Sequence, residues 1–186
     1  MRKNRLPPGQ TLREGFPVLH YGDIPEFDEG RWDFKVSGLV KIPMKLTYGE
    51  FLKLSSTEVT ADFHCVTGWS KFDLKWKGVL FKTIALMAQP LEEARFVYII
   101  SDHGYTTNLP LEVAMDDDVI FAYGYGGKLL TPEHGFPLRI VVPKRYAYKS
   151  AKWVRGIEFL REDKPGFWEL RGYNNSADPW KEERFS

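Results

Sequence analysis

The chain contains a single cysteine, Cys65, in the run Asp62-Phe63-His64-Cys65-Val66-Thr67-Gly68-Trp69. A lone cysteine cannot form a disulfide within its own chain. Its side chain is therefore a packed hydrophobe, a reactive thiol or a metal ligand. If this run is a strand, His64 is no catalytic partner for the thiol, because neighbouring strand residues point to opposite faces. The cysteine alone leaves its three roles open, with a packed core residue the commonest.

A second group of residues that could do chemistry follows position 130. It reads His134-Gly135-Phe136-Pro137-Leu138-Arg139 and then Lys149-Ser150-Ala151-Lys152-Trp153. Two lysines around a serine, with backbone amides near the start of a strand, can hold a phosphate by charge-assisted hydrogen bonds. The planar guanidinium of Arg139 suits a phosphate or the edge of a heterocycle. The simpler interpretation is a pair of solvated lysines and a structural arginine.

Other catalytic patterns are missing from the sequence. There is no Gly-x-Ser-x-Gly motif, no Walker phosphate loop, no His-Glu-x-x-His motif and no second cysteine for a zinc site. The carboxylate run Asp116-Asp117-Asp118 could bind a hard cation, but such a run is more often a solvated turn. The cysteine run and the basic segments are therefore the main candidates for a functional site.

Composition narrows the class of protein. The 186 residues are 43% hydrophobic and 27% charged, as expected for one globular domain with a sizeable core. The net charge of +1 predicts no nucleic-acid partner, and no apolar run is long enough to predict insertion into a membrane. A single cysteine, with no export signal at the start of the sequence, indicates a reducing, cytoplasmic setting.

The elements that must position these residues are mostly short. Periodicity predicts strands over residues 31–40, 58–66, 96–100, 119–123, 138–142 and 152–161, with a further segment beginning at Trp76. Short helices are expected over 47–52, where Thr47 and Glu50 form a capping box, and over 81–88 and 111–115. Residues 124–127 have turn composition. We expect a single α+β domain over residues 1–186 with mixed sheets and short helices, an extended arm at 1–30 and a loosely held tail at 174–186.

With these elements in place, the chain resembles the molybdopterin-binding domain of the sulfite oxidase family. Four stretches follow the family pattern in order and cover most of residues 16–173. They are Phe16 to Gly22 with Gly38-Leu39-Val40, Phe63 to Trp69 with Trp76-Lys77-Gly78-Val79, Ser101 to Leu111, and His134 to Arg139 with Val142-Pro143 and Lys149 to Trp153. The fourth stretch is the most specific. The resemblance implies the fold of that domain and Mo-molybdopterin as the cofactor.

The resemblance also implies roles for individual residues. Cys65 would be the catalytic residue and the metal ligand, because the family binds molybdenum through a cysteine thiolate beside two pterin sulfurs, and a soft thiolate suits a transition metal. The residues implied to bind the cofactor are Leu19, His20, Ser101, Asp102, His134, Arg139, Ser150, Ala151 and Lys152. Candidate pocket residues near the metal are His64, Thr67, Trp69, Lys71 and Tyr105.

The implied function is oxygen-atom transfer to or from a small substrate by a molybdenum-dependent oxidoreductase. Because the sequence shows no haem domain, electrons would pass through a separate electron-transfer partner. Animal and plant sulfite oxidases carry an arginine after the cysteine, where Trp69-Ser70-Lys71 stands here. Sulfite oxidation and sulfoxide or N-oxide reduction therefore both stay open. The alternative is a non-catalytic molybdopterin-binding or carrier module with the same fold.

Overall fold

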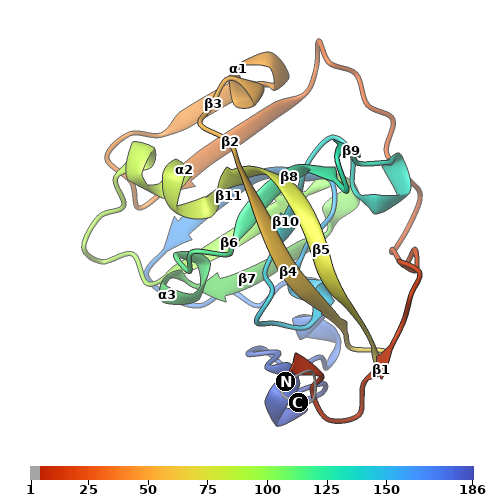
Figure 1. Ribbon diagram of the computed structural model, residues 1–186. Coiled ribbons are helices and arrows are strands. Elements are labelled where there is room, and N and C mark those ends of the chain that lie inside the picture. Colours follow the sequence, from red (N-terminus) through yellow and green to blue (C-terminus); the bar gives the residue numbers. More distant parts are fainter. Residues whose placement is uncertain (1–4) are drawn as a thin grey trace.

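Two β-sheets around an apolar core make up most of the computed structural model, which describes residues 5–186 (Figure 1). The first sheet contains β1 (Thr11–Leu12), β4 (Thr57–Cys65), β5 (Trp69–Leu80), β8 (Ile120–Tyr125), β9 (Lys128–Leu129) and β10 (Arg139–Val141). Its central strand, β5, pairs parallel with β1 and antiparallel with β4 and β8. This pairing brings the end of β4, and with it Cys65, beside the start of β5.

The second sheet has the order β3-β2-β11-β6-β7. Its strands are β2 (Asp33–Gly38), β3 (Met44–Thr47), β6 (Phe96–Ser101), β7 (Thr106–Pro110) and β11 (Val154–Leu160). Strands β2 and β11 run parallel, and the other neighbours run antiparallel. Gly156 of β11 faces β2 so closely that a Cβ atom there would lie 2.5 Å from the carbonyl oxygen of Lys35. Glycine is therefore required where these two strands meet.

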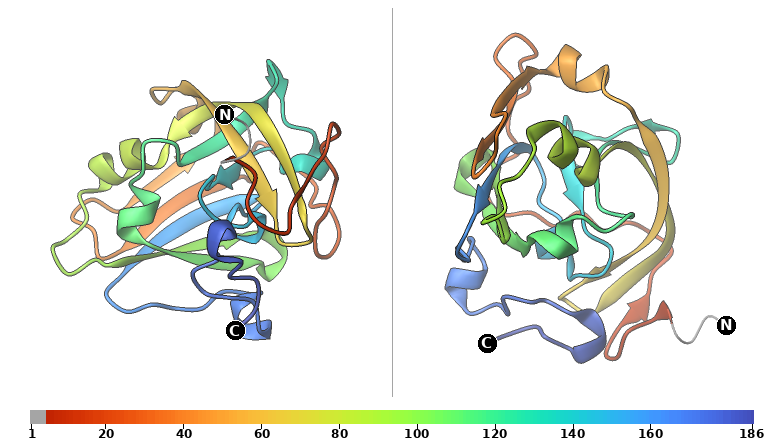
Figure 2. Two further views of the ribbon diagram at one scale, coloured as in Figure 1. Left: turned by 60° about the horizontal axis from the view of Figure 1, so that its bottom comes forward. Right: turned by 90° about the vertical axis from the view of Figure 1, so that its left-hand side faces the viewer.

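Three short helices complete the fold: α1 (Tyr48–Leu52), α2 (Phe81–Ala88) and α3 (Leu111–Ala114). The capping box of α1 is confirmed, since Glu50 N donates to Thr47 Oγ1 at 3.3 Å and Thr47 N donates to the Glu50 carboxylate at 2.8 Å. Helices α2 and α3 lie at one end of the two sheets (Figure 2). Among residues 5–186, none of the helices has the length and apolar character needed to cross a membrane.

Among residues 5–186, two large apolar clusters fill most of the interior, and a small third one is formed by Tyr146, Tyr148 and Ala177. The larger of the two large clusters lies between the sheets and includes the aromatic residues Phe34, Phe51, Phe81, Phe121 and Phe159. The smaller of the two is built on β4, β5, β8 and β10 and contains Phe63, Cys65, Trp69, Trp76 and Val141. Alternation along β5 turns Leu74 and Trp76 into this second cluster. Cys65 thus belongs to the smaller apolar cluster and not to the larger one between the sheets.

The expected fold class is confirmed, with mixed sheets and short helices. Strands or helices occupy each of the segments for which they were predicted, but several strands were missed or misplaced. Strand β5 begins at Trp69, seven residues before the expected start at Trp76. Its first part was missed because the backbone at Asp73 is left-handed and interrupts the apolar alternation along the strand. Gly124 and Tyr125, expected in a turn, belong to β8 because they pair with β5 and β9. Strands β3 and β7 carry no clear alternation in the sequence.

The described part of the expected arm, residues 5–30, runs largely without regular structure and contributes β1 to the first sheet. Residues 1–4 of that arm lie outside the described residues. The expectation of a loosely held tail is wrong. Ala177 is fully buried and its carbonyl accepts from Tyr146 N at 2.8 Å, while Arg184 donates to the carbonyl of Val66. The tail therefore packs against the end of β4.

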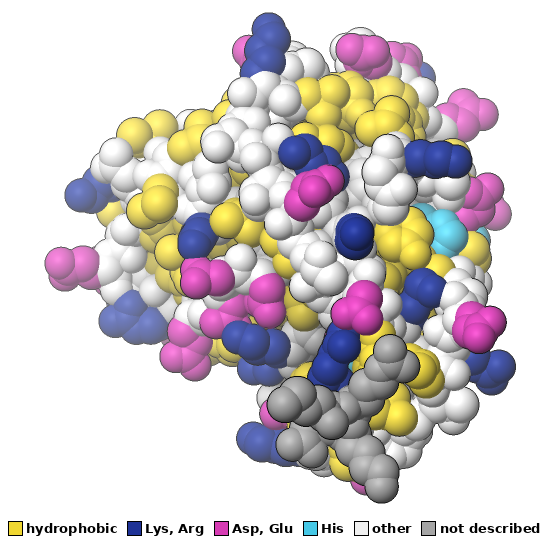
Figure 3. Space-filling model, viewed as in Figure 1, with side chains coloured by type: hydrophobic (Ala, Val, Ile, Leu, Met, Phe, Trp, Pro, Cys, Tyr) yellow, Lys and Arg dark blue, Asp and Glu magenta, His cyan; other side chains and the backbone are white. Residues whose placement is uncertain are grey.

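The surface shown in Figure 3 mixes both signs of charge. Lysine and arginine side chains lie interspersed with aspartate and glutamate on that face. Ion pairs on the molecular surface include Lys82 with Asp117 at 2.6 Å and Lys144 with Asp116 at 2.9 Å. These pairs assign Asp116 and Asp117 of the aspartate run to surface ion pairs with lysines.

Candidate functional site

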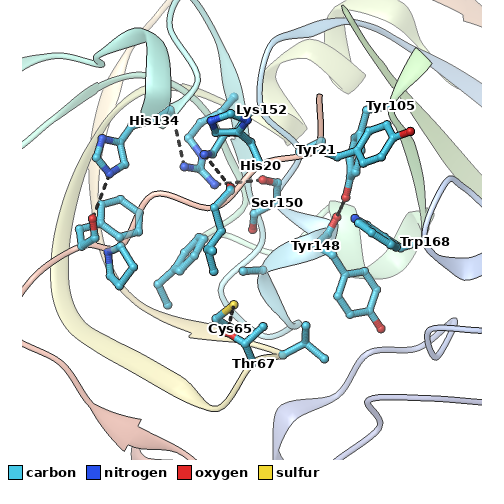
Figure 4. Close-up of a pocket in the computed structure, with 18 of the residues that line it drawn as sticks. His20, Tyr21, Cys65, Thr67, Tyr105, His134, Tyr148, Ser150, Lys152 and Trp168 are labelled. Carbon is cyan, nitrogen blue, oxygen red and sulfur yellow. Dashed lines mark hydrogen bonds between the residues drawn. The ribbon is translucent and has the colours of Figure 1, made fainter. Parts of the chain in front are cut away.

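A cavity of about 290 Å³ lies where the arm, the end of β4, the loop before β10 and the segment after β11 meet (Figure 4). Its lining contains most of the residues singled out from the sequence. The lining residues are Phe16, Pro17, Leu19, His20, Tyr21, Phe63, Cys65, Val66, Thr67, Trp69, Tyr105, His134, Arg139, Ala147, Tyr148, Ser150, Ala151, Lys152, Trp153, Trp168 and Tyr173. Segments separated by more than 150 residues in the sequence therefore build one site.

One side of the cavity presents the thiol. Cys65 ends β4 and is 7% exposed, and its Sγ lies 3.1 Å from Thr67 Oγ1 (Figure 4). The rings of Phe63 and Trp69 stack beside it with centroids 6.1 Å apart. The cysteine side is thus apolar apart from the thiol itself and the hydroxyl of Thr67.

The other side presents a buried guanidinium. Arg139 is 2% exposed and donates to the carbonyls of His134 and Ser150, both at 3.0 Å. Its Nε is buried and has no hydrogen-bond partner among residues 5–186. Burial lowers the pKa of Arg139 to about 9, because no carboxylate compensates the charge. This arginine is a cation held in place by neutral groups.

Lys152 adds a second cation on this side. Its Nζ donates to the carbonyls of Leu19 at 2.8 Å and Glu133 at 2.5 Å. Burial, and then repulsion from Arg139, lower its pKa to about 7. A Cβ atom on Gly135 would lie 3.0 Å from Arg139 Cβ and 3.2 Å from Lys152 Cβ, and its φ is +110°. Glycine at this turn lets the two cationic residues pack against the loop.

The arm closes a third side of the cavity. The His134 ring stacks on Phe16 at 4.6 Å, and its Nε2 lies 3.3 Å from the Phe16 carbonyl. Burial lowers the pKa of His134, which favours the neutral imidazole. The His20 ring packs edge-on against Trp153 at 5.5 Å. The loop at His134 and the segment with Lys152 and Trp153 therefore hold the arm as well as the two cations.

The structure brings eight of the ten implied site residues to the cavity: Leu19, His20, Cys65, His134, Arg139, Ser150, Ala151 and Lys152. It leaves Ser101 and Asp102 outside. Asp102 instead accepts from Arg155 Nη1 at 3.1 Å, beside a different, polar pocket. The chain turns away after β6, where His103 takes a left-handed conformation.

Among the candidate pocket residues, Thr67, Trp69 and Tyr105 line the cavity, whereas His64 and Lys71 do not. His64 faces away from Cys65, as expected for adjacent strand residues. Its Nδ1 lies 2.8 Å from Ser70 Oγ, and burial lowers its pKa to about 4. Lys71 donates to the carbonyl of Glu14 in the arm.

An aromatic wall was missed by the sequence analysis. It consists of Tyr21, Tyr148, Trp168 and Tyr173, and Tyr105 joins it by donating to the Tyr148 carbonyl at 2.5 Å. Tyr148 in turn donates to the carbonyl of Asn174 at 2.6 Å. The high aromatic content, 15% of the chain, was the available signal, but it gives no positions. The wall depends on a segment beyond β11 that has no periodic pattern.

The donor set can be tested against a metal cofactor. Within residues 5–186, no three His, Cys, Asp or Glu side chains lie close enough together to hold a metal ion by themselves. No Asp or Glu of this described part lines the cavity, so neither cation has a carboxylate there. One soft thiol facing two uncompensated cations fits a group that carries its own metal ligands at one end and negative charge at the other. Molybdopterin with molybdenum has this character.

Comparison with known proteins agrees with this fit. A family model described as "Oxidoreductase molybdopterin binding domain" matches residues 21–168. The uncharacterized oxidoreductase YuiH of Bacillus subtilis (strain 168) is 46% identical over 186 residues, which is all of this chain and 94% of that protein. The catalytic subunit MsrP of a protein-methionine-sulfoxide reductase from Campylobacter jejuni is 31% identical over 160 residues. This match covers 77% of the chain and 54% of that subunit, so the chain spans about half its length.

A solved structure shows the same fold. The sulfane dehydrogenase SoxCD from Paracoccus pantotrophus aligns with a TM-score of 0.71 at 23% identity, over 78% of this chain and 42% of that one. The expected resemblance, the oxidoreductase class and the molybdopterin cofactor are confirmed by these matches. The fold, the thiol-and-cation cavity and the matched residues lead to one assignment: the chain belongs to the oxidoreductase molybdopterin-binding domain family.

Proposed function

We propose that the cavity holds Mo-molybdopterin with Cys65 as the metal ligand, and that the loaded protein reduces a small neutral sulfoxide or N-oxide. The observation that carries this proposal is the cavity itself, in which the chain's single thiol faces two cations and no Asp or Glu of residues 5–186 belongs to the lining. When bound, the cofactor supplies a metal that cycles between oxidation states VI and IV and so accepts or donates an oxygen atom. The protein supplies one ligand and a shaped, partly apolar cavity.

The residues on the cationic side are suited to hold the negative end of the cofactor. Arg139 is fixed by two carbonyls and keeps Nε free of any protein partner. Lys152 holds its ammonium group between two carbonyls and can exchange one of them for a phosphate oxygen. An anion there would offset the cost of burying both charges. His134 and Phe16 would pack against the pterin.

The choice of substrate rests on charge. The side chains next to the thiol, those of Phe63, Val66, Thr67 and Trp69, are all neutral, and Lys71 points to the arm. The Arg139 guanidinium lies 5.2 Å from the Phe63 ring, but the proposal assigns this cation to the cofactor. An anion such as sulfite would then find no further cation beside the thiol, whereas a neutral oxide needs none. The similarity to MsrP, named as a methionine-sulfoxide reductase, supports the same choice. The balanced reaction is R₂SO + 2 H⁺ + 2 e⁻ → R₂S + H₂O.

The two electrons require a donor, which we propose is a separate electron-transfer protein. We also propose a cytoplasmic location, supported by the unpaired Cys65 thiol, which a reducing compartment keeps available for the metal. The carrier-module alternative keeps the same cavity without turnover. The aromatic wall beside the thiol favours an enzyme, because it shapes a space that a carrier has no need for.

Metal analysis is the first test. Protein purified from a molybdenum-replete host is expected to contain about one molybdenum and one pterin per chain, and Cys65→Ser to lose most of the metal, because a hydroxyl is a poor ligand for a soft site. Lys128→Met, on the exposed β9, is the control and should keep its metal. A wild-type preparation without molybdenum or pterin would contradict the proposal.

A substrate panel is the second test. With a reduced dye as electron donor, the loaded protein is expected to reduce methionine sulfoxide or trimethylamine N-oxide, and to oxidise sulfite far more slowly when a dye accepts the electrons. Faster sulfite oxidation would overturn the choice of a neutral substrate. Full cofactor loading without turnover of any of these compounds would instead support the carrier module.

A further inference from the structure

We propose that Gln10, Ser70 and His64 form a hydrogen-bonded chain that fixes the orientation of Cys65, so that Gln10 and Ser70 are positioning residues of the metal centre. This inference rests on the proposed function, because it takes Cys65 as the metal ligand. None of the three residues lines the cavity. Their action on the site passes through the backbone of the cysteine.

The hydrogen-bonded chain begins at the His64 ring on β4 and ends at the carbonyl of Cys65. His64 Nδ1 lies 2.8 Å from Ser70 Oγ, and Ser70 Oγ lies 3.1 Å from Gln10 Oε1. The same amide of Gln10 reaches the Cys65 carbonyl with Nε2 at 3.2 Å. Both His64 and Ser70 are buried, which shields these bonds from water.

The polarity of each bond follows from the one that cannot be reversed. The Cys65 carbonyl only accepts, so the amide nitrogen of Gln10 faces it. The amide oxygen then faces Ser70, whose single hydroxyl hydrogen is donated to it. Ser70 has no second hydrogen, so His64 must donate through Nδ1. The four groups therefore have one consistent arrangement of hydrogens, with every donor directed toward the cysteine.

Strand pairing holds this chain in place. His64 and Ser70 face each other across β4 and β5, and Cys65 faces Trp69 one position further along. Gln10 directly precedes β1, which is anchored by Thr11 N donating to the Gly68 carbonyl at 2.8 Å. The arm thus delivers the Gln10 amide to the corner where β4 turns into β5. The Cys65 carbonyl also accepts from Gly68 N at 3.0 Å.

Two consequences for the metal centre follow. With two donors on its carbonyl, the Cys65 peptide is fixed in one plane, and the direction of the Cα–Cβ bond that carries Sγ is fixed with it. These donors also place positive partial charge near the ligating cysteine, which raises the reduction potential of the metal. Loss of this hydrogen-bonded chain should leave Cys65 present as a ligand but misdirected, and should lower the reduction potential of the metal.

The test compares variants of the full-length, cofactor-loaded protein. Ser70→Ala removes the middle link, and Gln10→Glu places an acceptor where Cys65 needs a donor. Ser70→Thr restores the hydroxyl. Thr60→Ala is the matched control, because Thr60 is exposed on β4, the strand that also carries His64 and Cys65. We expect Ser70→Ala and Gln10→Glu to keep their molybdenum but to show a changed molybdenum EPR signal, a lowered midpoint potential and a kcat reduced about tenfold at unchanged KM. Ser70→Thr and Thr60→Ala should match the wild type.

A second readout needs no metal. In protein made without cofactor, iodoacetamide can alkylate only Cys65, the single cysteine. Loss of the chain should raise the alkylation rate severalfold, and Ser70→Thr should reverse the increase. If Ser70→Ala does not fold, Gln10→Glu decides, because Gln10 lies outside the strands. Unchanged EPR signal, potential and alkylation rate in the variants would overturn the inference and leave the proposed function standing. Absence of molybdenum from the wild type would overturn the proposed function and the role at the metal centre with it, whereas the alkylation rates would still test whether the three residues position Cys65.

Discussion

Arg139 and Lys152 carry positive charge in a place where charge is expensive. Both are held by backbone carbonyls, and burial lowers the pKa of each, to about 9 and about 7. Folded protein without an anion must either bear that cost or release the proton from Lys152. A negatively charged cofactor removes the cost. Stability without cofactor and affinity for cofactor are therefore opposed at these two residues.

Lys152→Met should reveal this opposition. The unfolded chain keeps Lys152 protonated up to about pH 10.5, whereas the folded chain releases the proton near pH 7. The unfolded state thus binds more protons between these values, and the stability of cofactor-free protein rises with pH across that window. The variant should therefore stabilise the cofactor-free protein more at pH 6 than at pH 9, as measured by thermal unfolding.

The same variant should weaken cofactor retention by roughly 10-fold to 100-fold, because a charge-assisted hydrogen bond is lost. Lys128→Met, on the surface, should change neither property. A larger gain in stability at pH 9 than at pH 6 would show that a protein group already compensates the Lys152 charge.

Local residue chemistry was readable from the sequence where a motif carries it. The cysteine run and the two basic segments predicted the thiol, Arg139 and Lys152 in the cavity, because a thiol, a guanidinium and an ammonium each have few roles. Lys149, expected with Lys152 to hold a phosphate, is instead buried in an ion pair with Glu169. Ser101 and Asp102 did not reach the cavity, since the direction of the chain after β6 depends on the left-handed His103. Tyr148 and Trp168 were missed because aromatic residues serve the core and a cavity wall equally well.

At the scale of elements, the short helical turn at Ala147–Lys149 and the one at Glu169–Arg171 hold two walls of the cavity together. Lys149 Nζ lies 2.6 Å from Glu169 Oε1, with the side chains 1% and 2% exposed. Lys149 also donates to the carbonyl and the side-chain oxygen of Asn108, both at 3.0 Å, and Thr107 donates to Glu169 at 2.7 Å. This buried network joins Ser150 on the cation side to Trp168 on the aromatic side.

Breaking this pair from one side should be costly. Lys149→Met leaves the Glu169 carboxylate buried without its cation, so the free energy of unfolding should fall by about 3–5 kcal/mol in urea titrations. The double variant Lys149→Met/Glu169→Gln removes both charges and should recover part of the loss. If the single variant costs no more than the double one, the pair contributes through packing alone.

Elements with a regular pattern were predictable, and those set by tertiary pairing were not. Helix α1 followed from its capping box, and β10 from a β-branched run closed by proline. The length of β5 depends on pairing with its three neighbouring strands, which continues on both sides of the left-handed residue Asp73. Sequence periodicity reports burial along one strand and carries no information about which strands meet.

At the scale of the whole molecule, the arm and the tail are joined by one side chain at the turn after Cys65. Arg184 donates to the carbonyl of Val66, the residue after Cys65, and to that of Gly9 in the arm at 3.3 Å. Its guanidinium also lies 5.0 Å from the Tyr146 ring. Figure 1 shows the last segment of the chain against the ends of β4 and β5. One side chain therefore links the arm, the tail and the turn that follows Cys65.

Arg184→Ala should loosen this corner. Loss of its charged hydrogen bonds should lower the free energy of unfolding by about 2 kcal/mol and expose the tail to limited proteolysis. Arg161→Ala, which removes an exposed ion pair at 3.7 Å, should cost less than about 0.5 kcal/mol and serves as the control. Equal protease resistance of Arg184→Ala and wild type would show that buried contacts such as Ala177 hold the tail without the arginine.

The composition of the cavity also sets the order of events during biogenesis. Its walls come from residues as far apart as Phe16 and Tyr173, and the corner at Cys65 is closed by Arg184. A nascent chain in which these segments have not yet all been synthesised lacks a complete cavity. Cofactor insertion must therefore follow the synthesis and folding of every segment from the arm to Arg184.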